Sequence, residues 1–253
     1  MRPRVIPVLL IDNGRLVKTI NFTKKIYIGD PINAIKIFNE KGADEVIVLD
    51  ITKDKNYKKP NFSLISKLAS ECFMPFSYGG GVKSESDLLK ILALGVEKVS
   101  INTYAIENPL FIKKISDKVG SSTIVVSIDV NKNIFGKYNI FSHNGTKKNK
   151  KDLAEYILMI QEYGAGEILL NSIHRDGTFS GYDIDLIKTV SQVTNIPLTV
   201  CGGASSVDDF IKAIKIGGAS AVAAGSLFVF HNNSRAVLIN TPGDEILNKL
   251  LGY

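Results

Sequence analysis

The sequence predicts a (β/α)8 TIM barrel with an internal two-fold repeat of half-barrels. Apolar, β-branched segments alternate with helical patterns over the whole chain, which gives eight β–α units. Motifs of the first half recur in the second half in the same order. The length of 253 residues suits one barrel, because barrels of this class commonly have about 250 residues. No linker or change of composition divides the chain, so we expect one domain over residues 1–253.

The expected strands are continuous apolar segments. Strands of a parallel sheet are buried on both faces, and the segment Ile-Val-Val-Ser-Ile at 124–128 has the corresponding composition. We expect strands at residues 5–11, 45–50, 74–78, 98–101, 123–129, 167–171, 197–201 and 219–223.

A helical pattern follows each expected strand. Two of these helices have recognisable first turns, because Ser84 and Ser206 each precede acidic residues, as a capping residue does. We expect helices at residues 31–41, 61–71, 84–94, 107–118, 151–163, 182–193, 206–216 and 243–251.

The repeat favours a closed barrel. The motifs at 49–52, 79–82 and 100–103 correspond to those at 170–172, 202–204 and 224–226. Their offset stays near about 120 residues, which indicates two half-barrels of four units each. The alternative is an open doubly wound sheet, but eight nearly equal units with two-fold repetition favour closure.

Composition and cysteine usage exclude several classes of protein. Cys72 and Cys201 lie far apart without metal-ligand spacing, which predicts a reduced, cytoplasmic protein. No apolar segment approaches the roughly 20 residues of a membrane span, so we expect no membrane partner. His143, His174 and His231 have no metal-ligand spacing, and there is no Rossmann glycine pattern, so we expect neither a metal site nor a cofactor.

Part of the net charge of +6 is local, in the cluster of Lys147, Lys148, Lys150 and Lys151. We expect this cluster to be a solvated loop that leads into a helix. No aromatic residues are interleaved for base stacking, so we expect no nucleic-acid partner. The other interpretation is that the cluster attracts anionic substrates.

Three glycine clusters follow expected strands. Glycine lets backbone N–H groups approach an anion, and barrel enzymes often bind phosphate in the loops after strands seven and eight. Tight turns alone are the alternative, but equivalent places in two half-barrels favour a ligand with a phosphate at each end. Gly80 and Gly81, with the segment 100–102, would bind one phosphate. The other would be bound by Gly202, Gly203, Gly225 and Ser226.

Polar residues stand at or just beyond the carboxyl ends of the strands, where side chains meet in the mouth of a barrel. They are Asp50, Asn102, Asp129, Asn171 and Asp176. A buried carboxylate there can act as a general acid or base. Capping or turn formation is the alternative for any single aspartate. Asp129 is the best candidate for catalysis, because it ends a predominantly apolar strand.

Charged residues begin four strands at the opposite end of the barrel. Arg4, Glu45, Lys98 and Glu167 alternate in sign and could form a salt-bridged ring around the barrel axis. The alternative is that they are ordinary solvated strand starts.

Ten motifs between about residues 4 and 230 carry a resemblance to a known family. They are Gly-Arg-Leu-Val-Lys at 14–18, Gly-Asp-Pro at 29–31, Leu-Asp-Ile-Thr at 49–52, Gly-Gly-Gly-Val at 79–82, Lys-Val-Ser-Ile-Asn-Thr at 98–103, Ile-Asp at 128–129, Gly-Ala-Gly-Glu-Ile-Leu-Leu at 164–170, Arg-Asp-Gly-Thr at 175–178, Ser-Gly-Tyr at 180–182 and Gly-Gly-Ala at 202–204. With them the chain resembles HisF, the cyclase subunit of imidazole glycerol phosphate synthase. The sister isomerase HisA shares the half-barrel plan, but the motifs at 164–170 and 175–182 are HisF-like.

The resemblance implies a mechanism and a partner. A HisH-like glutaminase would dock at the bottom of the barrel, and its ammonia would pass through the barrel to a phosphorylated substrate at the mouth. The ring of Arg4, Glu45, Lys98 and Glu167 would be the ammonia gate. Asp129 would be catalytic, and Lys18, Asp50, Asn102, Asn171 and Asp176 would bind the substrate.

One family residue is replaced. The family has a second catalytic aspartate on the first strand, at the position of Leu10. Asp12 is two positions on, and we assign it to the turn Asp12-Asn13-Gly14. Because leucine transfers no proton, the loss of one partner of an acid–base pair typically costs about 10²–10⁴ in rate. Asn171 and His174 also depart from the family's threonine and acid.

The altered first strand resembles the second-copy branch of the family, with members such as WbuZ and AglZ. That branch works with a HisH-like glutaminase and an N-acetyl sugar amidotransferase, and installs an acetamidino group on surface-glycan sugars. The alternatives are an ordinary cyclase of histidine biosynthesis that tolerates Leu10 and a non-catalytic scaffold.

Overall fold

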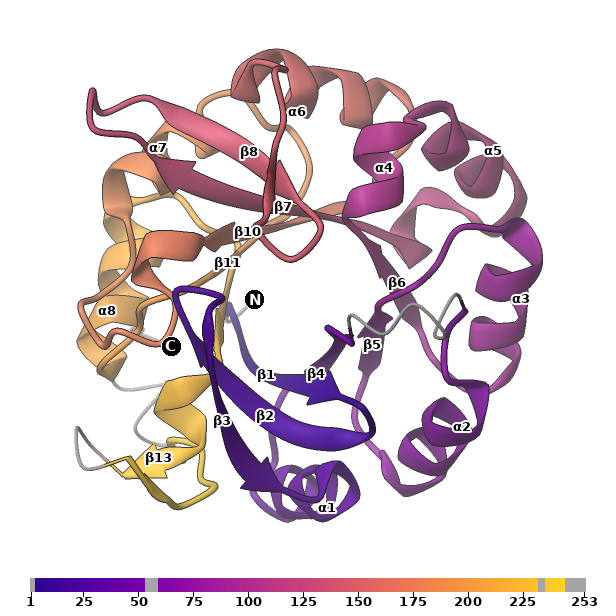
Figure 1. Cartoon of the computed structure of the whole chain (residues 1–253), viewed down its shortest axis with the longest axis vertical. Coiled ribbons are helices and arrows are strands. Elements are labelled where there is room, and N and C mark those ends of the chain that lie inside the picture. The colour runs from indigo at the N-terminus through magenta and orange to yellow at the C-terminus, as the bar shows by residue number, and fades with distance from the viewer. Residues whose placement is uncertain (1–2, 53–58, 232–234, 244–253) are drawn as a thin grey trace.

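A closed ring of parallel strands forms the centre of the computed structural model, which describes residues 3–52, 59–231 and 235–243 (Figure 1). Each strand pairs with the next around the ring, and the last strand pairs with the first. The eight strands of the ring in the described residues are β1 (Arg4–Asp12), β4 (Val46–Asp50), β5 (Phe76–Gly79), β6 (Lys98–Ile101), β7 (Ile124–Lys132), β10 (Glu167–Ser172), β11 (Leu198–Cys201) and β12 (Ala221–Ala224). The predicted TIM barrel is therefore confirmed, and the open sheet is excluded.

Helices surround the ring of strands (Figure 1). They are α1 (Pro31–Glu40), α2 (Phe62–Glu71), α3 (Glu85–Ala93), α4 (Thr103–Glu107), α5 (Leu110–Val119), α6 (Leu153–Glu162), α7 (Ile184–Ser191) and α8 (Val207–Ile211). Short turns are η1 (Ser121–Thr123), η2 (Ile173–Arg175), η3 (Lys212–Ile216) and η4 (Ser226–Phe228). None of the helices over the described ranges is long and apolar enough to cross a bilayer.

The helix starts follow from local chemistry. The Ser84 hydroxyl accepts a hydrogen bond from the Asp87 amide at 3.1 Å, as expected of a cap. Ser206 and Asp209 form a capping box at the start of α8. Asp30 caps α1, and Pro31 follows it in the first turn, where its missing N–H costs no helical hydrogen bond.

Three helix predictions need correction. The helix expected at 107–118 begins later, as α5 at Leu110, and Glu107 is the last residue of a separate short helix, α4. Pro109 disfavours helical geometry at the residue before it, which separates the two helices. The helix expected at 206–216 begins as α8 and continues as the π-helical turn η3. The helix expected at 243–251 lies outside the described residues except for Gly243, which is not helical.

Two hairpins extend the barrel strands beyond the ring, and the sequence analysis did not predict them. β2 (Arg15–Ile20) and β3 (Lys24–Gly29) follow β1. β8 (Tyr138–Ser142) and β9 (Lys147–Lys148) follow β7. A further small hairpin consists of β13 (Phe230–His231) and β14 (Ala236–Val237).

The first hairpin corrects the assignment of Asp12. This residue is the last of β1 and pairs with Arg15, so it belongs to the strand and not to the turn. Asn13 and Gly14 alone form the two-residue turn, and both have positive φ (50° and 75°), as a type I′ hairpin turn requires.

The two faces of the barrel strands pack into two separate apolar cores. A large cluster packs between strands and helices, and a small cluster around Ile6, Val8, Ile47 and Leu169 fills the barrel. On β1, Val5 and Leu9 point outward, while Ile6, Val8 and Leu10 point inward. Since side chains alternate along a strand, this register decides which residues reach the barrel interior.

Candidate active site at the mouth of the barrel

A cavity occupies the mouth, at the carboxyl ends of the barrel strands. The twelve residues predicted to bind substrate or phosphate or to catalyse all line this cavity: Lys18, Asp50, Gly80, Gly81, Asn102, Asp129, Asn171, Asp176, Gly202, Gly203, Gly225 and Ser226. The sequence therefore placed these residues at one site, although they come from nearly every unit of the barrel.

The glycine clusters line the mouth because only glycine fits there. Gly80 has φ 129°, and a Cβ atom on it would lie 2.6 Å from the Asp50 carbonyl oxygen. Gly203 has φ 104°, and a Cβ atom would overlap the Gly181 carbonyl oxygen. Both the backbone conformation and the close approach exclude side chains, so the main chain itself forms these walls of the cavity.

Asp129 is the most buried of the acidic residues that line the mouth. It points inward from β7, is only 8% exposed and lies beside Asn171 of the neighbouring strand. Burial, with the charge of Asp176 as a second cause, raises the pKa of Asp129 to about 7. A carboxyl group with this pKa can give or take a proton near neutral pH, which suits a general acid or base.

Asp176 and Lys18 line the mouth with opposite charges, and each influences the pKa of the other. The Thr19 hydroxyl donates a hydrogen bond to Asp176, and burial raises the pKa of Asp176 above its ordinary value. The Lys18 ammonium is 2% exposed and donates to the Val8 carbonyl oxygen. Burial lowers the pKa of Lys18 to about 8, although nearby acidic groups oppose the shift.

The remaining predicted side chains have structural contacts as well. The Asn102 amide donates to the Ser127 carbonyl oxygen at 3.0 Å, and Asp50 accepts from the Thr52 amide at 3.0 Å, which is a turn contact. The Asn171 Oδ1 atom is buried and accepts no hydrogen bond within the described part of the chain. An unsatisfied acceptor at the mouth is a contact point for a ligand donor.

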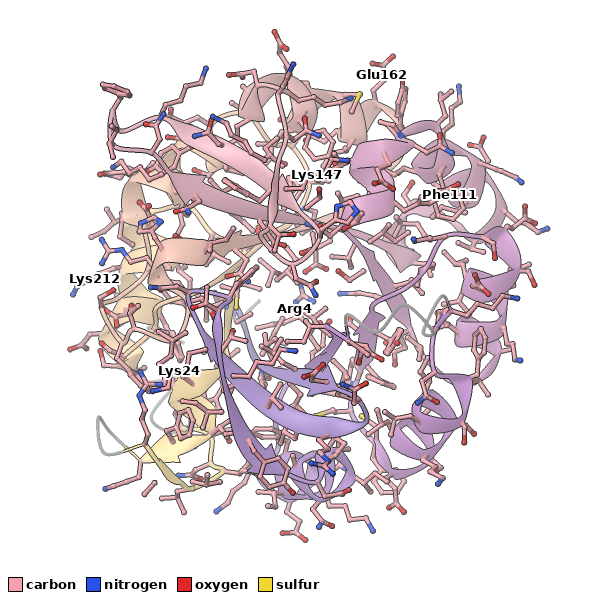
Figure 2. All side chains as sticks on the ribbon, viewed as in Figure 1. Arg4, Lys24, Phe111, Lys147, Glu162 and Lys212 are labelled. Atoms are coloured by element: carbon pink, nitrogen blue, oxygen red, sulfur yellow. The ribbon has the colours of Figure 1, made fainter. Side chains whose placement is uncertain are left out.

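The four charged residues at the floor form a closed ring around the barrel axis. Arg4 contacts both Glu45 and Glu167, the latter at 3.0 Å. Lys98 contacts the same two carboxylates, at 3.4 Å and 2.8 Å. Figure 2 labels Arg4 near the centre of the ring of strands. The sequence predicted this meeting, and the alternative of separate solvated strand starts is excluded.

Hydroxyl groups from two barrel strands, β5 and β11, hydrogen-bond to the carboxylates of the floor ring. The Ser77 hydroxyl donates to Glu45 at 2.7 Å, and the Thr199 hydroxyl donates to Glu167. Burial alone would raise the pKa of Glu167, but attraction to Arg4 and Lys98 lowers it below its ordinary value. Both carboxylates are therefore paired and hydrogen-bonded.

Comparison with known proteins agrees with this geometry. Residues 4–234 match the model of a family described as histidine biosynthesis proteins. A protein of Leptospira borgpetersenii is 50% identical over 243 residues, which is 96% of each chain, and is provisionally named imidazole glycerol phosphate synthase subunit HisF. Similar provisional names belong to a protein of Pseudomonas aeruginosa, 49% identical over 99% of this chain and 98% of its own, and to one of Vibrio vulnificus, 47% identical over 99% and 97%. The chain belongs to the HisF family.

The first strand of this HisF-family barrel presents an apolar wall to the mouth. Leu10 lines the cavity together with its neighbour Leu49. Asp12 is not among the residues that line the cavity and pairs with Lys25 at 2.6 Å. Asp12 therefore brings no carboxyl group from β1 into the cavity.

Sequence reasoning missed the residues that cross over the mouth of this HisF-family chain. The Asn144 amide donates to the Ile51 carbonyl oxygen at 2.9 Å, and Phe22 of the β2–β3 turn lines the same cavity. The pair Asn144-Gly145 is a hairpin-turn signal that could have indicated this turn. No local signal indicates that Phe22 reaches the cavity.

No metal centre or reactive thiol is found at the site. In residues 3–52, 59–231 and 235–243, no group of three His, Cys, Asp or Glu side chains could hold a metal ion. Cys201 lines the mouth, but burial raises the pKa of its thiol to about 12, so the unreactive protonated form dominates.

Proposed function

We propose that this HisF-type barrel binds a ligand with a phosphate at each end and receives ammonia from a HisH-like glutaminase docked at its floor. The observation that supports this proposal is the arrangement of two glycine-lined walls at the mouth above a ring of four charged side chains at the opposite end. The ring surrounds the barrel axis, and moving one of its side chains would open the floor to a small neutral molecule.

We further propose that the ammonia leaves the barrel for a second enzyme, an N-acetyl sugar amidotransferase, which forms an acetamidino group on a surface-glycan sugar. Leu10 supports this acceptor, because it takes the place where the cyclase reaction needs a proton-transferring side chain.

The second candidate is the cyclase reaction of imidazole glycerol phosphate synthase. The names of the relatives favour it, and so does Asp129, whose pKa near 7 suits proton transfer. In this reaction Asp129 would be the only acid–base residue. The rate would be lower because no second carboxyl group stands at the position of Leu10. A non-catalytic scaffold would need neither the buried carboxyl group of Asp129 nor the ion pairs of the floor ring.

The test combines the purified chain with its glutaminase partner, glutamine and the bisphosphorylated ribulosyl substrate, and measures imidazole glycerol phosphate. We expect only slow turnover by the natural chain and an increase of about tenfold or more in Leu10→Asp, because a second carboxyl group then faces Asp129. Leu49→Asp is the matched control, since it adds a carboxyl group to the same cavity at another position and is expected to gain nothing.

Two outcomes would contradict the sugar-modification proposal. Rapid formation of imidazole glycerol phosphate by the natural chain would show that Leu10 is tolerated. Equal gains in Leu10→Asp and Leu49→Asp would show that the position of the acid is irrelevant.

A further inference from the structure

The net charge of the chain is concentrated in one segment of 22 residues. Residues 130–151 contain six lysines and no acidic residue or arginine, which equals the formal net charge of +6 of the whole chain. The rest of the chain is therefore balanced, with 25 basic and 25 acidic residues. The lysines of the segment are Lys132, Lys137, Lys147, Lys148, Lys150 and Lys151.

The structure leaves these six lysines on the surface of the β7–β8–β9 extension and of the turn before α6. All six are exposed. None of the six is in an ion pair within the described ranges, where the paired lysines are Lys25, Lys36, Lys98, Lys114, Lys118 and Lys212. Lys132 and Lys151 lie over the rings of Tyr138 and Tyr156 instead. Uncompensated cations gathered on one extension attract an anionic surface.

An apolar tip projects from the same extension. Ile134 and Phe135, in the turn between β7 and β8, are 94% and 88% exposed, the highest values among large hydrophobic side chains in the described residues. The Asn133 side chain holds the turn, because it accepts hydrogen bonds from the Phe135 and Lys137 amides at 2.9 Å. Figure 1 shows the hairpin reaching the outline of the molecule beside α7.

We propose that this extension, residues 130–151, binds an anionic membrane surface, with Ile134 and Phe135 inserted at the headgroup level and the lysines on lipid phosphates. Apolar side chains that enter the interface while flanking lysines contact anionic headgroups are the features of surface binding. Two side chains at a hairpin tip offer little area for a stable protein interface, which favours the membrane over a protein partner. This proposal departs from the expectation of no membrane partner, which rested on the absence of a membrane span; surface binding needs no span.

Tryptophan fluorescence gives a direct test, because the chain has no tryptophan of its own. Phe135→Trp places a single reporter at the tip. Phe73→Trp is the matched control, since Phe73 is 86% exposed in the turn between α2 and β5, which leads into the floor end of a barrel strand. With vesicles of phosphatidylcholine and about 40% phosphatidylglycerol, we expect a blue shift for Phe135→Trp and none for Phe73→Trp.

Co-sedimentation with the same vesicles tests both parts of the surface. We expect the natural chain to bind them and not vesicles of phosphatidylcholine alone. Ile134→Asp with Phe135→Asp, and separately the change of Lys147, Lys148, Lys150 and Lys151 to glutamine, should each weaken binding by about tenfold or more. Phe73→Asp should bind like the natural chain.

Absence of binding to anionic vesicles would overturn the proposal and would leave a protein partner for the extension. Binding without a blue shift at position 135, or binding that survives both aspartates at the tip, would also overturn it, because it would show adsorption by charge alone. The substituted side chains are exposed, so unchanged melting temperatures are expected and should be checked for every variant.

Discussion

Asp129 is a buried acid that lines the cavity at the mouth of the barrel. The alternation of β7 points it inward, while its neighbours Ile128 and Val130 pack against the helices. Burial then raises its pKa to about 7. The apolar composition of the strand indicated that Asp129 would be buried. The shift of its pKa depends on the surrounding barrel, which no local sequence pattern describes.

We predict that Asp129→Asn stabilises the protein at pH 8. The raised pKa means that the folded state favours the neutral acid, so stability is fully present below about pH 4 and falls as the pH rises towards 7. A shift from 3.8 to about 7 corresponds to a cost on the order of 4 kcal/mol above pH 7. Because asparagine does not ionise, urea unfolding should show this gain at pH 8.

The same variant provides its own control at low pH. Near pH 4 both proteins carry a neutral side chain at this position, and their free energies of unfolding should be similar. An equal difference between them at pH 4 and pH 8 would show that ionisation of Asp129 does not destabilise the fold.

At the scale of elements, continuous apolar segments located all eight barrel strands, and capping residues located helix starts such as Ser84. The turn signals Asn13-Gly14 and Asn144-Gly145 are present, but the hairpins escaped prediction because the flanking residues 15–29 and 138–148 have a mixed composition without a strong period. Tertiary contacts decide them, since β2 pairs with the extended end of β1, and β8 with that of β7. The two hairpins bring Phe22 and Asn144 over the mouth.

The close approach at Gly203 predicts a large effect of a small substitution. In Gly203→Ala the new Cβ would overlap the Gly181 carbonyl oxygen, and the residue would keep a positive φ. We expect a loss of stability on the order of 3 kcal/mol, and weaker binding of glycerol phosphate. Urea unfolding and isothermal titration calorimetry measure the two effects.

Gly42→Ala separates the effect of backbone strain on stability from the effect of steric overlap. Gly42 also has a positive φ, at 67°, but a Cβ atom added to it would meet no other atom within 4 Å. We expect a loss of only about 1 kcal/mol and unchanged ligand binding. If both variants lose the same stability and affinity, the close packing of the Gly203 turn has no role in the site.

Across the whole molecule, alternate side chains of a strand lie on the same face, so each inward-facing row runs from the floor of the barrel to the mouth. Arg4 and Leu10 lie on the same face of β1, and Glu167 and Asn171 on the same face of β10. Charged residues at the strand starts therefore meet below the inner apolar cluster, and polar residues at the strand ends meet above it. These separations can be read from the sequence, but only closure brings residues such as Arg4 and Glu167 into contact.

We predict that Glu167→Gln destabilises the barrel near neutral pH. Removing one carboxylate leaves Arg4 and Lys98 with a single partner, and breaking a buried pair typically costs about 3–5 kcal/mol. The lowered pKa of Glu167 means that the ring's stabilisation is present above its ordinary pKa of 4.5 and is lost as the pH falls below it. The difference between the two proteins should therefore shrink in acid, as followed by circular dichroism.

Glu85 offers a matched control on the surface. It also contacts two lysines, Lys114 and Lys118, but at the exposed start of α3. We expect Glu85→Gln to have nearly the melting temperature of the natural chain, because water screens exposed pairs. Comparable losses in both variants would argue that the enclosed position of the floor ring has no special energetic effect.

The sequence by itself determined the barrel class, the eight strands and the residue types at their two ends, because burial on both faces and glycine turns leave local patterns. Tertiary structure decided what closure brings together: the charged ring at the floor, the hairpins over the mouth and the pKa of Asp129. These depend on contacts between residues far apart in the chain and on the exclusion of water, which arise only when the last strand pairs with the first.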